Sequence, residues 1–141
     1  MATQETFDSL ADAARASFPT SSTRIVAIRE SGDAGYALFD TAPSGSHYLY
    51  GVHYARIDGR WIEGVSSNGP SWSSVGRDPN LGTFTDWDVA PAGADRVRIQ
   101  LGDDIREEAV ENDIYLVVWW QVPVPIRSVE HRSFRIGGRW R

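Results

Sequence analysis

Six carboxylates stand close together between residues 103 and 113, and they form the densest group of ionisable side chains in the sequence. The run DDIREEAVEND contains Asp103, Asp104, Glu107, Glu108, Glu111 and Asp113, with Arg106 as its single cation. It lacks the glycine and the alternating oxygen ligands of a calcium-binding loop, so we expect no metal there. The run can instead form a negative face that attracts a basic protein and accelerates their encounter. The alternative is a solvated connector that keeps two apolar strands soluble.

Three aromatic residues form a second candidate site. Trp72, Phe84 and Trp87 lie in a glycine- and proline-rich stretch that has little apolar alternation. Exposed rings of this kind can stack on a sugar or act as hot spots for a protein partner. The alternative is that they fold back over a sheet as a small satellite core. We predict a binding surface made of these aromatic residues and the carboxylates of the acidic run up to Glu111.

The remaining ionisable and nucleophilic residues do not form a catalytic pattern. His47 and His53 lie six positions apart, which on one extended strand separates their side chains by about 20 Å, so they cannot share a metal. His131 can approach them only through the fold. The sequence contains no nucleophile elbow, zinc-protease, P-loop or dinucleotide-binding motif. We therefore predict no catalytic residue, no metal site and no cofactor.

The composition bounds the class of protein. A chain of 141 residues is expected to form one domain. Fourteen arginines, no lysine and nineteen acidic residues give a net charge of −5, and no basic stretch carries interleaved aromatics, so nucleic acid is disfavoured as a partner. There is no cysteine, and therefore no disulfide framework. Asp8 and Asp12 interrupt residues 1–20, so we expect neither a signal peptide nor a membrane segment, and a cytoplasmic location.

The periodicity of the apolar residues predicts one helix followed by strands. An amphipathic helix is expected over residues 3–18, with Thr3 as its N-cap, because apolar residues recur at spacings of three and four. Alternation predicts a first β meander over 24–65 and a second over 96–141, in which residues 114–122 form a central strand covered on both faces. Residues 66–95 are expected to be a long loop, although loops of this length are uncommon in compact domains.

One six-residue phrase occurs twice, as RIDGRW at 56–61 and as RIGGRW at 135–140. Its Asp58-Gly59 pair is typical of a two-residue type I′ hairpin turn, which needs positive φ at both central positions. Similar spacing before each copy is consistent with a three-strand meander used twice, whereas the alternative is that the same turn chemistry arose independently. In either case we expect Trp61 and Trp140 to be buried packing residues.

The order of these motifs resembles small proteins of high-GC actinobacteria that have no assigned function. The resemblance covers most of the chain and rests on DGRW-x-E, NGPSW, LGTFTDW, APAGADRVRI, YLVVWWQVP and FRIGGRW. It implies no activity. The helix followed by DGRW is also similar to NTF2-like roll proteins, but the acid–base pair of a cone-shaped pocket is missing.

We therefore predict a mainly β protein, namely an antiparallel β-sandwich of about seven strands with one N-terminal amphipathic helix. The alternative is an α+β roll of the NTF2 or cystatin type. The predicted function is a non-enzymatic module that binds another, basic protein, as an immunity protein or an inhibitor does. The alternatives are a small-ligand or carbohydrate-binding domain and an NTF2-like enzyme. The sequence leaves the oligomeric state open.

Overall fold

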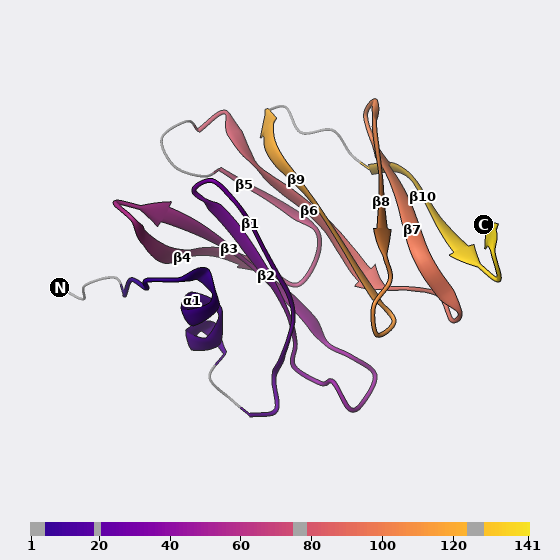
Figure 1. Cartoon of the computed structure of the whole chain (residues 1–141), viewed down its shortest axis with the longest axis horizontal. Coiled ribbons are helices and arrows are strands. Elements are labelled where there is room, and N and C mark those ends of the chain that lie inside the picture. The colour runs from indigo at the N-terminus through magenta and orange to yellow at the C-terminus, as the bar shows by residue number, and fades with distance from the viewer. Residues whose placement is uncertain (1–4, 19–20, 75–78, 124–128) are drawn as a thin grey trace.

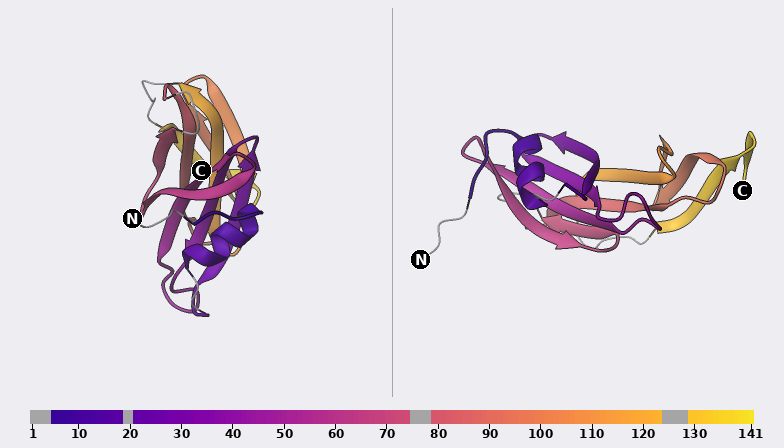
Figure 2. Two further views of the ribbon diagram at one scale, coloured as in Figure 1. Left: turned by 90° about the vertical axis from the view of Figure 1, so that its left-hand side faces the viewer. Right: turned by 90° about the horizontal axis from the view of Figure 1, so that it is seen from below.

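The protein is mainly β, with one short helix and three antiparallel sheets stacked as layers (Figure 1). The structure is a computed structural model that describes residues 5–18, 21–74, 79–123 and 129–141. The helix and the last strands lie at opposite ends of the elongated molecule (Figure 2). The predicted β-sandwich class is confirmed, but the described residues form eleven strands rather than about seven.

The first sheet is a continuous meander with the order β1-β2-β3-β4. Its strands are β1 (Arg24–Ser31), β2 (Ala34–Asp40), β3 (Leu49–Ile57) and β4 (Arg60–Ser67). Asp58 and Gly59 join β3 to β4 with φ values of 53° and 76°, as a type I′ turn requires. Alternation along β3 directs Val52 and Tyr54 toward the helix and Leu49 toward the second sheet.

Helix α1 (Leu10–Ser17) is shorter than the predicted helix over 3–18, and the expected N-cap Thr3 lies outside the described residues. The actual N-cap is Ser9, whose hydroxyl accepts a hydrogen bond from the Asp12 amide at 3.1 Å. Before it the chain is extended, because the Phe7 amide and carbonyl pair with those of Trp61 at 2.9 and 2.8 Å. The N-terminal segment therefore pairs with the edge of β4 instead of adding helical turns.

The second sheet has the order β5-β6-β9 and overturns the loop predicted over 66–95. Its strands are β5 (Ser71–Ser74), β6 (Leu81–Val89) and β9 (Ile114–Pro123). Strand β6 lacks a clear apolar alternation because polar residues occupy buried positions. Thr83, Thr85 and Asp86 are each at most 1% exposed. A search for alternating apolar residues therefore misses the strand.

The third sheet has the order β11-β10-β7-β8. Its strands are β7 (Ala94–Leu101), β8 (Asp104–Ala109), β10 (Val129–Ile136) and β11 (Arg139–Trp140). The second meander predicted over 96–141 is therefore wrong, because β9 leaves this sheet and pairs with β6. RIGGRW forms the same kind of turn as RIDGRW, with Gly137 and Gly138 at φ 58° and 78°, but the strands around it do not repeat the first sheet.

Strand β9 lies at the centre of the stack and is covered on both faces, as predicted. Ile114, Leu116 and Val118 pack against the first sheet in one core cluster. Their neighbours Tyr115, Val117 and Trp119 pack against the third sheet in another. A third cluster joins the helix to the opposite face of the first sheet. Each layer is therefore held by its own apolar interface.

Candidate functional site

Trp87, one of the predicted aromatic anchors, belongs to the core between the first two sheets. It is 5% exposed, and its Nε1 donates a hydrogen bond to the Tyr36 hydroxyl at 2.6 Å. The facing strand makes room with Gly51, since a Cβ there would stand 1.7 Å from the Tyr36 hydroxyl oxygen. Trp87 is therefore a packing residue of the sheet interface and presents no surface to a partner.

Trp72 and Phe84 lie on the opposite face of the second sheet from Trp87. They are cross-strand partners, and both are partly buried. The Trp72 indole crosses Gly82, where a Cβ would come within 2.6 Å of the ring, and donates to the Val122 carbonyl oxygen at 3.1 Å. Phe84 packs against the Trp119 ring, with 5.7 Å between the ring centroids. The three predicted anchors therefore do not share one surface, and packing accounts for much of their contact.

The acidic run, which is expected to be either a binding face or a connector, forms an edge strand with its two flanking turns. Its middle is β8, the terminal strand of the third sheet. Asp103 lies in the turn from β7, and Glu111 pairs with Ile114 in the turn to β9. Five of its six carboxylates were predicted as site residues, and all five lie on exposed residues: Asp103, Asp104, Glu107, Glu108 and Glu111.

Two of these carboxylates, those of Glu107 and Asp104, form ion pairs with arginines of the third sheet. Glu107 Oε1 accepts hydrogen bonds from Arg98 Nε and Nη2 at 2.9 and 2.7 Å, and these bonds lower the pKa of Glu107 below its ordinary value. Arg96 lies 3.6 Å from the same carboxylate. Asp104 Oδ2 accepts from Arg106 Nε at 3.0 Å. Among the described residues, Asp103, Glu108, Glu111 and Asp113 form no ion pair.

Arg106, the single cation of the run, has a role that the sequence argument missed. Its Nη1 donates to the Val118 carbonyl oxygen at 2.9 Å, and its guanidinium lies 5.7 Å from the centroid of the Trp119 ring. This contact satisfies a backbone group on the outer edge of the apolar strand β9, and so protects that edge. The only cation among six carboxylates was the signal that could have identified it.

The acidic run also accounts for the whole net charge of the protein. The chain has 19 acidic residues and 14 arginines, and the run contains 6 of those acids and 1 of those arginines. The remainder is 13 acids and 13 arginines, which sums to zero, so the run alone supplies the net charge of −5. The excess negative charge of the molecule therefore lies in the acidic run, whose middle is an edge strand.

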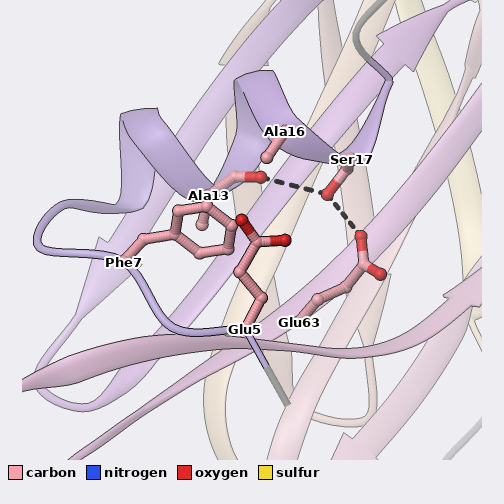
Figure 3. Close-up of a pocket in the computed structure, with 6 residues that line it drawn as sticks. All are labelled: Glu5, Phe7, Ala13, Ala16, Ser17 and Glu63. Carbon is pink, nitrogen blue, oxygen red and sulfur yellow. Dashed lines mark hydrogen bonds between the residues drawn. The ribbon is translucent and has the colours of Figure 1, made fainter. Parts of the chain in front are cut away.

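A small pocket lies at the other end of the molecule, between the N-terminal segment, α1 and β4 (Figure 3). It is lined by Glu5, Phe7, Ala13, Ala16, Ser17 and Glu63. The Ser17 hydroxyl contacts Glu63 and the Tyr54 hydroxyl, the latter at 2.6 Å, and burial raises the pKa of Tyr54. The volume of this pocket, about 150 Å³, is below the roughly 300–1,000 Å³ of common ligand sites.

The three histidines occupy separate environments. His47 lies before β3 with φ 60° and its Nδ1 stands 2.5 Å from Asp40 Oδ2, whereas His53 lies between the first two sheets and contacts the Ser71 hydroxyl at 2.8 Å. His131 is exposed on β10. Within residues 5–18, 21–74, 79–123 and 129–141, no group of three or more potential ligands is arranged to hold a metal ion. No helix in these ranges is long and apolar enough to cross a membrane.

Comparison with protein-family models found no match to the chain, and no curated protein or solved structure matches it either. The resemblance to actinobacterial proteins and to NTF2-like rolls therefore stays a prediction.

Proposed function

We propose that this protein is a non-enzymatic interaction module that binds a basic protein through the acidic run 103–113. The observation that carries the proposal is the concentration of the whole net charge on one sheet edge. A localised negative field raises the rate at which a basic partner meets this surface in the correct orientation. An immunity protein or an inhibitor of a basic enzyme would have this property.

The apolar part of the contact comes from the same strand. Ile105 is 58% exposed on β8, where Asp104 precedes it and Glu107 and Glu108 come after Arg106. An exposed apolar side chain within a charged rim is the usual arrangement of a protein contact, since the apolar centre supplies affinity and the rim supplies orientation. Ile105 thus takes the place of Trp87 as the proposed apolar contact.

Carbohydrate binding is less well supported by the geometry. A stacking platform needs a ring that is open to solvent, whereas Trp87 is buried and the Trp72 indole lies against Gly82.

The expected cytoplasmic location is kept as part of the proposal, and subcellular fractionation of the native host would test it.

The test uses a charge reversal that spares the ion pairs of the third sheet. Glu107 is unsuitable, because an arginine there would face Arg96 and Arg98. The double variant Glu108→Arg/Glu111→Arg changes the charge by +2 at each site, from −5 to −1. Immobilised protein would capture partners from a lysate of the native host, and the association rate would then be measured with the purified partner. We expect the rate to fall by about tenfold or more and to lose most of its salt dependence.

A matched control carries the same change of net charge at other exposed positions. Glu30→Arg/Glu130→Arg also moves the charge from −5 to −1, but it leaves the acidic run intact. This variant should keep most of the association rate. If both variants slow association equally, net charge rather than the acidic run controls binding, and the proposed site is wrong.

A further inference from the structure

The free edge of β8 presents unpaired backbone groups in a regular pattern. In an antiparallel pair, successive residues direct their amide and carbonyl groups alternately toward the partner strand and away from it. The Val110 amide donates a hydrogen bond to the Asp95 carbonyl oxygen at 2.9 Å, so the backbone groups of Val110 point toward β7. By alternation along the β7–β8 register, those of Asp104, Arg106 and Glu108 also point toward β7. The backbone groups of Ile105, Glu107 and Ala109 therefore point outward. No backbone hydrogen bond from another described segment meets them.

Two other sheet edges, those of β4 and β9, are protected by contacts that the edge of β8 lacks among the described residues. The edge of β4 pairs with Phe7. The edge of β9 is covered at Ile114 by Glu111 and at Val118 by Arg106. Natural proteins protect sheet edges in this way because an open edge invites another strand. Within the described ranges, the outer edge of β8 is protected by charge alone, and charge excludes only strands of like charge.

The charge of β8 selects the kind of strand that can pair with it. A second copy of this chain would bring Glu107 and Glu108 of one molecule close to the same residues of the other, which is unfavourable for directly opposed like charges. A basic segment would meet complementary charge instead. The edge therefore discriminates against self-association and favours a basic, extended partner.

We propose that β8 accepts an extended segment of a basic partner as an added strand of the third sheet. This inference rests on the proposed function and specifies how the partner binds. Backbone bonds to Ile105, Glu107 and Ala109 supply affinity in this mode, and alternate side chains supply specificity. A β-branched residue of the partner lies opposite Ile105, on the outer face. A lysine or arginine lies opposite Glu108, on the face that turns toward the second sheet.

The probe is a blocked, fluorescently labelled peptide of sequence Val-Lys-Thr-Thr-Val-Lys, added to the full chain. Its control is the same peptide with N-methyl groups on alternate residues, which keeps the charge but removes the donors of one edge. We expect the unmodified peptide to bind at least about tenfold more tightly than the methylated one in fluorescence anisotropy. Hydrogen exchange at the amides of Ile105, Glu107 and Ala109 should slow on binding. Equal binding of the two peptides, no binding of either, or unchanged exchange at all three amides would overturn the inference.

Ala109→Pro tests the same edge from the side of the protein. Proline there removes an outward N–H that the β7–β8 ladder does not use, so the fold should tolerate it. Ala109→Ser keeps the N–H and is the matched control. We expect Ala109→Pro to weaken peptide binding by about tenfold and Ala109→Ser to leave it nearly unchanged, with the circular dichroism spectra of both variants matching the parent.

The same variants separate this inference from the proposed function. If Glu108→Arg/Glu111→Arg slows association of the natural partner while Ala109→Pro does not affect its binding, the acidic run binds by its side chains and strand addition is wrong. If neither variant affects the natural partner, both proposals fail.

Discussion

His53 shows how a single buried side chain links the core to pH. It is 2% exposed between the first two sheets, where its Nε2 contacts the Ser71 hydroxyl at 2.8 Å and its ring meets Tyr36 edge-on, with 4.7 Å between centroids. Its Nδ1 is buried and has no hydrogen-bond partner among the residues that the structure describes. Burial disfavours the charged imidazolium and lowers the pKa of His53 from 6.5 to about 4.

Stability should therefore fall as the pH is lowered from about 6.5 to about 4. In this window the unfolded chain binds a proton at His53 and the folded protein does not, so protonation favours unfolding. The shift in pKa from 6.5 to about 4 corresponds to a loss of up to about 3 kcal/mol, and the contribution is fully present above pH 6.5. Urea denaturation at pH 7.5 and pH 4.5 would measure it.

The control for this prediction is His53→Gln, which keeps a polar side chain of similar length without the titration. Its stability should depend much less on pH across the same window. Asp40 does not confuse the comparison, because its hydrogen bonds outweigh the effect of its burial and lower its pKa, so its contribution is lost only in more acidic solution. A His53→Gln variant with the parent's full pH dependence would show that another group is responsible.

The two RIxGRW hairpins have the same local structure, but we expect them to contribute differently to the free energy of unfolding. In the first, Trp61 is 2% exposed and packs beneath α1 in the core cluster. In the second, Trp140 stays partly exposed on a strand of two residues, with the Arg98 guanidinium 3.9 Å from the centroid of its ring. The prediction that both tryptophans are buried is confirmed for Trp61 and wrong for Trp140, because none of the described layers covers the outer face of the third sheet.

Trp61→Ala should accordingly destabilise the protein much more than Trp140→Ala. Removal of a buried tryptophan costs about 3–5 kcal/mol, since it forfeits apolar burial and leaves a cavity. A partly exposed ring that stacks on one arginine should cost about 1 kcal/mol. Guanidinium denaturation of the two variants would compare them. Equal losses would mean that β11 contributes to a core as important as the one beneath the helix.

At the level of the whole molecule, the layers predict an order of local stability. The β6–β9 pair lies between two other sheets, whereas β11 has a single neighbouring strand at the edge of the stack. Segments with more buried apolar contact open only with global unfolding, while edges open locally. The second sheet should therefore be the most protected part of the chain.

Native-state hydrogen exchange would test this order. The amides of Tyr115, Val117 and Trp119 should exchange with the free energy of global unfolding, because they lie in the strand that is covered on both faces. The amide of Trp140 should exchange at a much lower free energy. Similar protection at the two sites would contradict the layered assignment of stability.

Several features follow from the sequence because they depend on neighbouring residues alone. The Asp58-Gly59 turn is set by the positive φ that both positions must adopt. The two faces of β3 follow from strict alternation, and the double coverage of β9 follows from apolar residues at successive positions. The sequence contains no recognisable catalytic motif, which favours a binding function, and the acidic run from Asp103 to Asp113 remains the proposed binding site.

The choice of strand partners required the tertiary structure, because it depends on residues distant in the chain. Strand β9 pairs with β6 rather than with β10, so the two halves are not copies of one meander. The polar residues of β6 give it no apolar alternation. Asp86 can be buried there because Arg132, 46 residues away, donates two hydrogen bonds to its carboxylate. Strand pairing also places Trp72 and Trp87 on opposite faces of the second sheet. It makes the middle of the acidic run the edge strand of the third sheet. Burial and edge position are properties of the assembled layers, which no local window of the sequence contains.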